Sequence, residues 1–242
     1  MKAVESGGTG FSTITCEALI RSVETKRAAL VSGLLTWWCT ARREYPWRRR
    51  GVTPYEVLLA EVLLKRTTAR SAERAFPRFL EAWPDVKALL RATDDDLTRA
   101  LSTVGLQRQR TKTLKDVAWY ISLHEGGRIP DTLEGLSRIP HIGPYTARAV
   151  LSFAYDIPVA VVDSNVVRVI GRLFSGVLAG RPAQNTVQAV ADMLIPKESH
   201  REFNYAVLDF GALVCRYTNP RCSVCPVKGQ CDYVDQEVCD SG

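Results

Sequence analysis

The sequence predicts an all-α protein, and three observations lead to this fold class. Apolar residues recur at helical spacing almost throughout the chain from Lys26 onward, as at Leu30, Leu34 and Trp38. Prolines and glycines cut the chain into segments of ordinary helix length. Neither a series of strands nor an internal repeat stands out. With 242 residues, the chain is long enough to bury a sizeable core.

The charge of the chain is the first indication of a partner. It carries 32 lysines and arginines against 26 aspartates and glutamates, a formal net charge of +6. This excess of positive charge favours a polyanionic partner such as nucleic acid. No uncharged apolar stretch has the length that a membrane span needs. Two basic clusters, around Trp47 and after Gly105, contain Arg42, Arg43, Arg48, Arg49, Arg50, Arg108, Arg110, Lys112 and Lys115.

Three segments of the chain can be interpreted from local patterns. Residues 1–24 are rich in Ser, Thr and Gly and lack sustained periodicity, so we expect a flexible N-terminal lead-in. Residues 54–69 place Val57 and Val62 on one apolar face, and we expect a single helix there. The short apolar stretch 157–162 is expected to be an extended connector that leads into the next helix, rather than a strand.

Four cysteines near the end of the chain have a spacing that few families use. Cys215, Cys222, Cys225 and Cys231 form a C-x6-C-x2-C-x5-C pattern. Four thiolates can bind zinc or an iron–sulfur cluster. The single C-x2-C fits a loop around a [4Fe–4S] cluster better than the paired knuckles of structural zinc sites. Zinc and disulfides stay open as alternatives, although an odd total of seven cysteines disfavours disulfides.

Residues 136–150 are interpreted as a helix, a tight hairpin and a second helix. Pro140 ends the first helix, Gly143 supplies a permissive turn, and small residues from Thr146 onward open the second helix. Such a hairpin presents free backbone N–H groups at a helix N-terminus. These groups suit a phosphate oxygen of a DNA backbone.

Asp163 follows this hairpin and precedes the four cysteines. In this order of motifs the chain resembles the helix-hairpin-helix DNA glycosylases of the endonuclease III and MutY superfamily, over about residues 30–235. The resemblance implies a helical barrel lobe over 47–157 that contains the hairpin. It also implies a second lobe, from 25–46 plus 158–242, that holds a [4Fe–4S] cluster on the four cysteines.

The resemblance implies roles for three catalytic residues. Asp163 matches an aspartate that stays ionised, stabilises an oxocarbenium-like sugar and orients a water, although a helix N-cap is its alternative role. Glu61 matches a glutamate that assists the leaving base, and its apolar neighbours predict a raised pKa; an exposed helix glutamate is the alternative. Tyr145 stands where strand-cleaving members carry lysine. Because a phenol forms no Schiff base, a monofunctional glycosylase without strong AP-lyase activity is implied.

The same resemblance implies a set of DNA contacts. Lys65 and Arg66 match a wedge that fills the gap left by an extruded nucleotide. His141 replaces a hairpin glycine; if that site needs positive φ, the residue is strained, and we predict a phosphate contact that strengthens at low pH. The residues expected to bind DNA are Lys65, Arg66, Gln107, Arg108, His141, Gly143, Tyr145 and Thr146.

The substrate follows from a closer resemblance, to thymine-DNA glycosylases of the archaeal Mig type that act on G·T mismatches. Tyr145, the K-R-T-T-A run at residues 65–69 and the 11 residues after Cys231 (242 − 231) carry it. It implies a monomeric, cytoplasmic, nucleoid-associated prokaryotic enzyme that removes thymine, and uracil, opposite guanine in double-stranded DNA. The alternatives are adenine excision opposite 8-oxoguanine, a non-catalytic DNA-damage-binding protein and a zinc-ribbon transcription factor.

Overall fold

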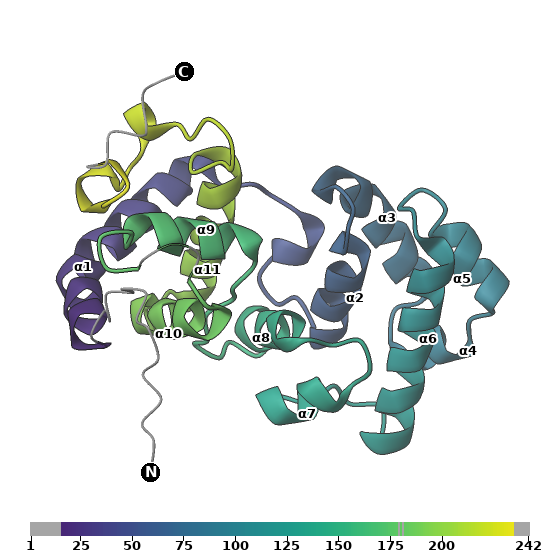
Figure 1. Ribbon diagram of the computed structural model, residues 1–242. Helices are drawn as coiled ribbons and strands as arrows, with labels where there is room; N and C mark the ends of the chain where they lie inside the picture. Colours follow the sequence, from purple (N-terminus) through teal and green to yellow (C-terminus); the bar gives the residue numbers. More distant parts are fainter. Residues whose placement is uncertain (1–15, 179, 181, 235–242) are drawn as a thin grey trace, which may run out of the picture.

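The computed structural model describes residues 16–178, 180 and 182–234, which confirm the all-α prediction (Figure 1). These residues form helices and short connections without a strand, and no helix among them is long and apolar enough to cross a membrane. The elements are α1 (Cys16–Ala41), η1 (Pro46–Arg48), α2 (Pro54–Leu64), α3 (Ala69–Ala82), α4 (Val86–Arg91), α5 (Asp94–Ala100), α6 (Gln107–His124), α7 (Leu133–Arg138), α8 (Pro144–Phe153), α9 (Ser164–Leu173), α10 (Gln184–Leu194), α11 (His200–Leu213), η2 (Cys222–Val224) and η3 (Lys228–Gln230).

The helices gather into two groups that meet at α8 (Figure 1). In one group α1, α9, α10 and α11 pack against one another, and the cysteine segment lies beside them. The other group contains α2 to α7, with α6 packed on α2, α4 and α5. Helix α8 contacts α2 and α7 on one side and α11 on the other, so it connects the two groups.

Helix α1 begins inside the segment that we expected to be flexible. Residues 1–15 lie outside the described part of the chain, but residues 16–24 already belong to α1. Val23 is fully buried. The side chains of Lys26 and Arg27 donate hydrogen bonds to carbonyls at the ends of α9 and α10, at 3.1 and 2.8 Å. The flexible lead-in was therefore wrong from residue 16 onward, because tertiary contacts hold this turn of helix.

The single helix expected over residues 54–69 is interrupted by a turn. Helix α2 ends at Leu64, and α3 begins at Ala69. Between them Arg66 has a left-handed backbone, with φ +54°, which ends a right-handed helix. The guanidinium of Arg110 donates to two carbonyls at the end of α2, at 2.8 and 2.6 Å. These carbonyls have no partner within the helix, so Arg110 caps it from outside.

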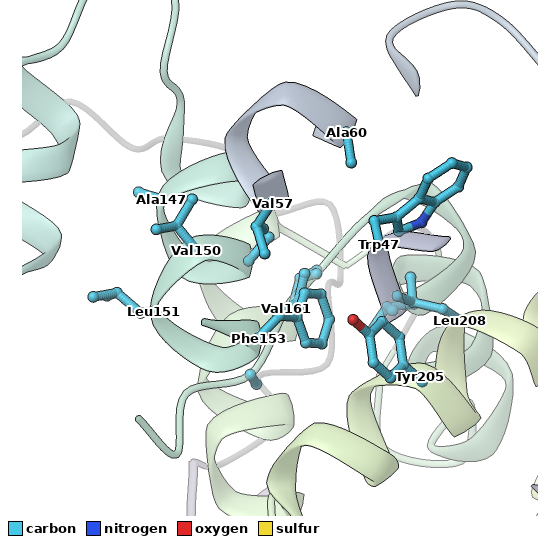
Figure 2. Close-up of a cluster of buried hydrophobic side chains, with 14 of the residues drawn as sticks. Trp47, Val57, Ala60, Ala147, Val150, Leu151, Phe153, Val161, Tyr205 and Leu208 are labelled. Carbon is cyan, nitrogen blue, oxygen red and sulfur yellow. The ribbon is translucent and has the colours of Figure 1, made fainter. Parts of the chain in front are cut away.

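A continuous apolar core joins the two groups of helices (Figure 2). Side chains of α2 and α8 meet those of α11 there, and the ring of Phe153 stacks on that of Tyr205 at 4.1 Å between centroids. Because close-packed interiors resist deformation, this core fixes the side chains at its rim relative to one another. Its labelled members are Trp47, Val57, Ala60, Ala147, Val150, Leu151, Phe153, Val161, Tyr205 and Leu208.

The segment 157–162 is an extended connector, as the sequence predicts. Its buried backbone pairs with side chains instead of a strand: the N–H of Val161 donates to Oδ1 of Asn204 on α11, at 3.0 Å. This connector joins α8 to the start of α9, where Asp163 lies.

Candidate active site

A cavity of about 390 Å³ lies where α2, α8 and the start of α9 meet. Glu61, Tyr145 and Asp163, the three residues expected to be catalytic, all line it. Lys65 and Thr146, from the expected DNA-binding set, line it as well. The other lining residues are Arg43, Tyr45, Trp47, Arg48, Leu64, Thr67, Ala69, Asn165 and Leu208.

Glu61 is a buried carboxyl on a helix that is almost entirely inside the protein. Its exposure is 8%, and its neighbours on α2 are equally hidden. Burial raises the pKa of Glu61 to about 8; Asp163 adds to this rise, while Lys65 and Arg48 oppose it. The alternative of an exposed glutamate is therefore wrong, and the raised pKa is confirmed. At neutral pH this carboxyl is protonated and can donate a hydrogen bond.

Asp163 occupies the N-cap position of α9 while also facing the cavity. Its Oδ1 accepts the N–H of Val166 at 2.8 Å, and its Oδ2 accepts Nδ2 of Asn165 at 2.8 Å. Both donors and the positive end of the helix dipole suit a negatively charged carboxylate. The N-cap considered for Asp163 is confirmed, and its catalytic role stays a prediction.

A short relay of hydrogen bonds runs from Asp163 to the cysteine segment. Arg168 donates to Oδ1 of Asn165 at 2.8 Å and to the carbonyl of Cys215 at 2.9 Å. It also donates to the carbonyl of Gly211 at 2.6 Å. A Cβ at position 211 would lie 2.7 Å from Cβ of Asn165, so glycine is what lets α11 approach α9 this closely. The carboxylate and the first cysteine are thus held by the same two side chains.

One wall of the cavity depends on a buried aspartate that the sequence did not reveal. Asp209 on α11 is fully buried and accepts from Arg43 Nε at 2.6 Å, Arg48 Nη1 at 2.8 Å and Trp38 Nε1 at 3.0 Å. Burial alone would raise the pKa of Asp209, but the hydrogen bonds from Arg48 and Arg43 lower it. The guanidinium of Arg48 also lies 4.4 Å from the ring centroid of Tyr205. A single aspartate within the apolar run 206–213 was the available signal.

The helix-hairpin-helix is confirmed, with α7 and α8 on either side of the turn. The left-handed residue of the turn is His141, with φ +65°. Gly143 has φ −89°, so the permissive turn that we assigned to it was wrong. Gly143 is instead the N-cap of α8, and no side chain caps this helix. The first N–H groups of α8 are therefore available to an anion.

His141 is tied to the rest of the protein on two sides. Its Nε2 lies 2.8 Å from Oδ2 of Asp116 on α6, and the same carboxylate accepts Nζ of Lys112 at 2.7 Å. The backbone carbonyl of His141 accepts Nζ of Lys65 at 2.8 Å. The hairpin is thus joined both to α6 and to the turn after α2.

The basic run after Gly105 divides into buried and exposed members. Arg110 is buried and donates to the carbonyl of Gly105 at 2.8 Å as well as to the end of α2. Lys115 donates to two carbonyls at the end of α4, at 2.8 and 2.7 Å. Both of these side chains therefore cap helices. Arg108 is exposed and Gln107, the first residue of α6, is half-buried, while Arg66 is exposed on the turn after α2.

The four cysteines of the C-terminal segment line one small cavity of about 20 Å³. Burial raises the pKa of the Cys225 thiol to about 11 and also raises the pKa of Cys231. Nη1 of Arg172 lies 3.4 Å from Sγ of Cys215. A four-thiolate centre requires four sulfur ligands around one point. In the described residues, however, no group of three or more His, Cys, Asp or Glu is placed to hold a metal ion.

Comparisons with known proteins agree on one family. Residues 59–193 match the family described as HhH-GPD superfamily base excision DNA repair protein. A thymine/uracil-DNA glycosylase of Methanothermobacter thermautotrophicus is 32% identical, over 87% of this chain and 96% of that protein. An adenine DNA glycosylase of Mycobacterium tuberculosis is 37% identical, over 85% of this chain and 68% of that protein.

Solved structures of DNA glycosylases and of endonuclease III have a fold similar to that of this chain. The structure of a thermostable thymine-DNA glycosylase is similar with a TM-score of 0.84 and 31% identity, over 89% of this chain and 99% of that one. A non-covalent endonuclease III–DNA complex has a TM-score of 0.76 and 23% identity, over 89% of this chain and 97% of that one.

Proposed function

Because the chain belongs to the HhH-GPD superfamily of base excision DNA repair proteins, we propose that it is a DNA glycosylase that removes thymine, and uracil, opposite guanine. The observation that carries this proposal is the convergence of Glu61, Tyr145 and Asp163 on one cavity. The reaction hydrolyses the N-glycosidic bond of a nucleotide flipped out of double-stranded DNA and leaves an abasic site.

In this mechanism Asp163 faces the sugar of the flipped nucleotide. As the N-glycosidic bond lengthens, positive charge develops at C1′, and a fixed carboxylate nearby stabilises it. The two hydrogen bonds from Val166 and Asn165 hold that carboxylate in place before the substrate arrives. The same carboxylate orients the water that attacks C1′.

Glu61 assists the base on the other side of the bond. Its raised pKa keeps the carboxyl protonated at neutral pH, so it can donate to a carbonyl oxygen of the departing pyrimidine as negative charge develops there. Burial also raises the pKa of Tyr145 well above its ordinary value, so this side chain stays a neutral hydroxyl in the cavity wall. A phenol at this position supports base removal without strong AP-lyase activity.

The DNA backbone is proposed to bind across the hairpin and the two turns beside it. The uncapped start of α8, after Gly143, offers backbone N–H groups to one phosphate. The turn after α2, the start of α6 and the hairpin would face the flanking phosphates and the gap left by the flipped nucleotide; they contribute Lys65, Arg66, Gln107, Arg108 and His141.

We also propose that Cys215, Cys222, Cys225 and Cys231 hold a [4Fe–4S] cluster. The C-x6-C-x2-C-x5-C spacing and the position of the four cysteines around one cavity support this proposal. When bound, the cluster would act as a scaffold that fixes the basic C-terminal segment. The chain's own contribution is the relay through Arg168 and Asn165, which joins this segment to the position of Asp163.

Adenine excision is the second candidate, favoured by the 37% identity to an adenine DNA glycosylase. One assay separates the candidates: incubation with duplexes containing G·T, G·U, 8-oxoguanine·A or inosine·T pairs, followed by alkaline cleavage of abasic sites. We expect release from G·T and G·U, and no release by Asp163→Asn. Release confined to 8-oxoguanine·A would support the second candidate, and release from none of the duplexes would contradict both.

A further inference from the structure

Lys65 brings a primary amine to the cavity of the two carboxylates. It is the C-cap residue of α2, one turn after Glu61, and it lines the cavity together with Tyr145 and Asp163. Tyr145 cannot form an imine, whereas an amine can. The chemistry that is missing at Tyr145 is therefore present at another residue of the same cavity.

The size of the cavity places this amine within reach of the sugar. A sphere of the volume found here would be about 9 Å across, within the usual range for ligand sites. If Asp163 faces C1′, as the proposed function requires, then C1′ lies inside this space. A lysine amine sits on a flexible four-carbon stem and can move several ångströms by rotamer changes. Lys65 and Asp163 line the same cavity, so rotamer changes of Lys65 bring its amine towards the proposed position of C1′.

The surroundings of Lys65 lower the pKa of its amine. Burial and the neighbouring Arg110 guanidinium lower the pKa of Lys65, although Glu61 opposes this shift. A lower pKa increases the fraction of amine that can act as a nucleophile at neutral pH. In the free protein Nζ donates to the carbonyl of His141 at 2.8 Å, and this hydrogen bond must break before attack. Attack by Lys65 is therefore slower than attack by an unrestrained amine.

We propose that Lys65 captures the abasic product as an imine. This inference rests on the proposed function, because base removal creates the sugar aldehyde. The amine of Lys65 adds to C1′ of the ring-opened sugar, and the aldehyde oxygen leaves as water after proton transfer, which forms the C1′=N bond. Hydrolysis reverses the step. Loss of a C2′ proton to a cavity carboxylate would break the C3′–O bond and release the 5′-phosphate of the downstream strand.

Reductive trapping tests the inference directly. The full-length protein is incubated with duplex DNA that already contains an abasic site opposite guanine, in the presence of sodium borohydride. Borohydride supplies the hydride that converts an imine into a stable secondary amine. We expect a covalent protein–DNA complex on a denaturing gel, and peptide mapping by mass spectrometry should place the adduct on Lys65.

Two variants sharpen this test. Lys65→Arg keeps the positive charge but lacks the nucleophilic amine, and we expect at least a tenfold loss of trapped complex. Lys112→Arg, at an exposed lysine on α6, is the matched control and should trap as well as the parent. Fluorescence anisotropy with the same DNA corrects each yield for binding.

Three results would overturn the inference: no adduct with the parent protein, an adduct mapped to another residue, or undiminished trapping by Lys65→Arg. Because the abasic site is preformed, these outcomes do not depend on base release. A failure of the proposed function would appear separately, as absence of thymine release from G·T duplexes.

Discussion

Glu61 and Asp163 line the same cavity, but α2 and α9 hold them in opposite environments. Glu61 lies in the middle of a buried helix, where desolvation raises its pKa to about 8. Asp163 lies at the N-terminus of an amphipathic helix, half-buried, with both oxygens accepting N–H donors. One carboxyl is thus kept neutral, and the other is surrounded by groups that stabilise a negative charge.

The difference between the two environments shows how one site can use the same chemical group, a carboxyl, in two roles. A neutral carboxyl can donate to the leaving base, and a charged one can stabilise the cationic sugar. The position along a helix decides which role is available: the interior of α2 removes water, whereas the start of α9 supplies backbone donors. Substitutions of the two carboxyls should therefore lower the rate of base release by different amounts.

The largest expected effect is that of Asp163→Asn. The amide cannot stabilise the developing positive charge at C1′, and we expect single-turnover thymine release to fall by about 10³-fold or more. Asparagine is as good an N-cap as aspartate, so the melting temperature should change little. A rate of thymine release within tenfold of the parent rate would contradict a catalytic role of Asp163.

Glu61→Gln is expected to have the second largest effect on the rate of thymine release. In addition, this substitution should make the protein more stable. Glutamine keeps the shape but loses the acidic proton, so thymine release should slow by about 10²-fold. Between the ordinary pKa of glutamate and about 8, the unfolded parent ionises while the folded parent stays protonated, so its stability falls as pH rises. At pH 7 the variant should be more stable, by about 1–3 kcal/mol.

Urea denaturation at pH 5 and pH 7 measures this change in stability. The gain from Glu61→Gln should be larger at pH 7 than at pH 5. A variant that is less stable than the parent at both pH values would contradict the burial cost assigned to Glu61.

A smaller effect is expected where the relay to Asp163 is cut. Arg168→Met removes the donors to Asn165 and to the carbonyl of Cys215. The carboxylate of Asp163 then loses one support, and we expect about a tenfold lower kcat with an unchanged KM. Arg168→Lys should recover part of the rate. A rise in KM at unchanged kcat would indicate a role in DNA binding instead of positioning.

The smallest effect concerns the hairpin. The structure pairs the ring of His141 with Asp116, in place of a free ring that reaches for phosphate. If this pairing preorganises the hairpin, Asp116→Asn should lower DNA affinity by about 2–5-fold.

Lys112→Ala is the control for this prediction, because it removes the other partner of Asp116 and leaves His141 in place. Fluorescence anisotropy with the abasic duplex measures the affinity of both variants. A higher affinity of Asp116→Asn than of the parent would show instead that the freed ring of His141 contacts phosphate directly.

The sequence predicted those parts of the site that depend on local patterns. The helix-hairpin-helix over residues 136–150, the connector 157–162 and the N-cap character of Asp163 all follow from neighbours a few residues apart. The raised pKa of Glu61 was also predictable, since its helix is apolar on every side.

What the sequence missed depends on contacts between distant segments. The break after Leu64 requires Arg110 as an external cap, and the apolar pattern continues across it. Asp209 meets Arg43 and Arg48 only once α11 packs beside η1. The positive φ considered for His141 is confirmed, whereas the permissive turn assigned to Gly143 was wrong, because residue type alone does not fix which hairpin residue turns left-handed.

The most direct test of the division of roles is the pH dependence of single-turnover thymine release from a G·T duplex. With Glu61 as the neutral donor, the rate should be level up to about pH 8 and then fall about tenfold per pH unit, because the pKa of this carboxyl is raised to about 8. Glu61→Gln should be slower and should show no such fall. A parent rate that rises through pH 8, or an equal fall in the variant, would contradict the account.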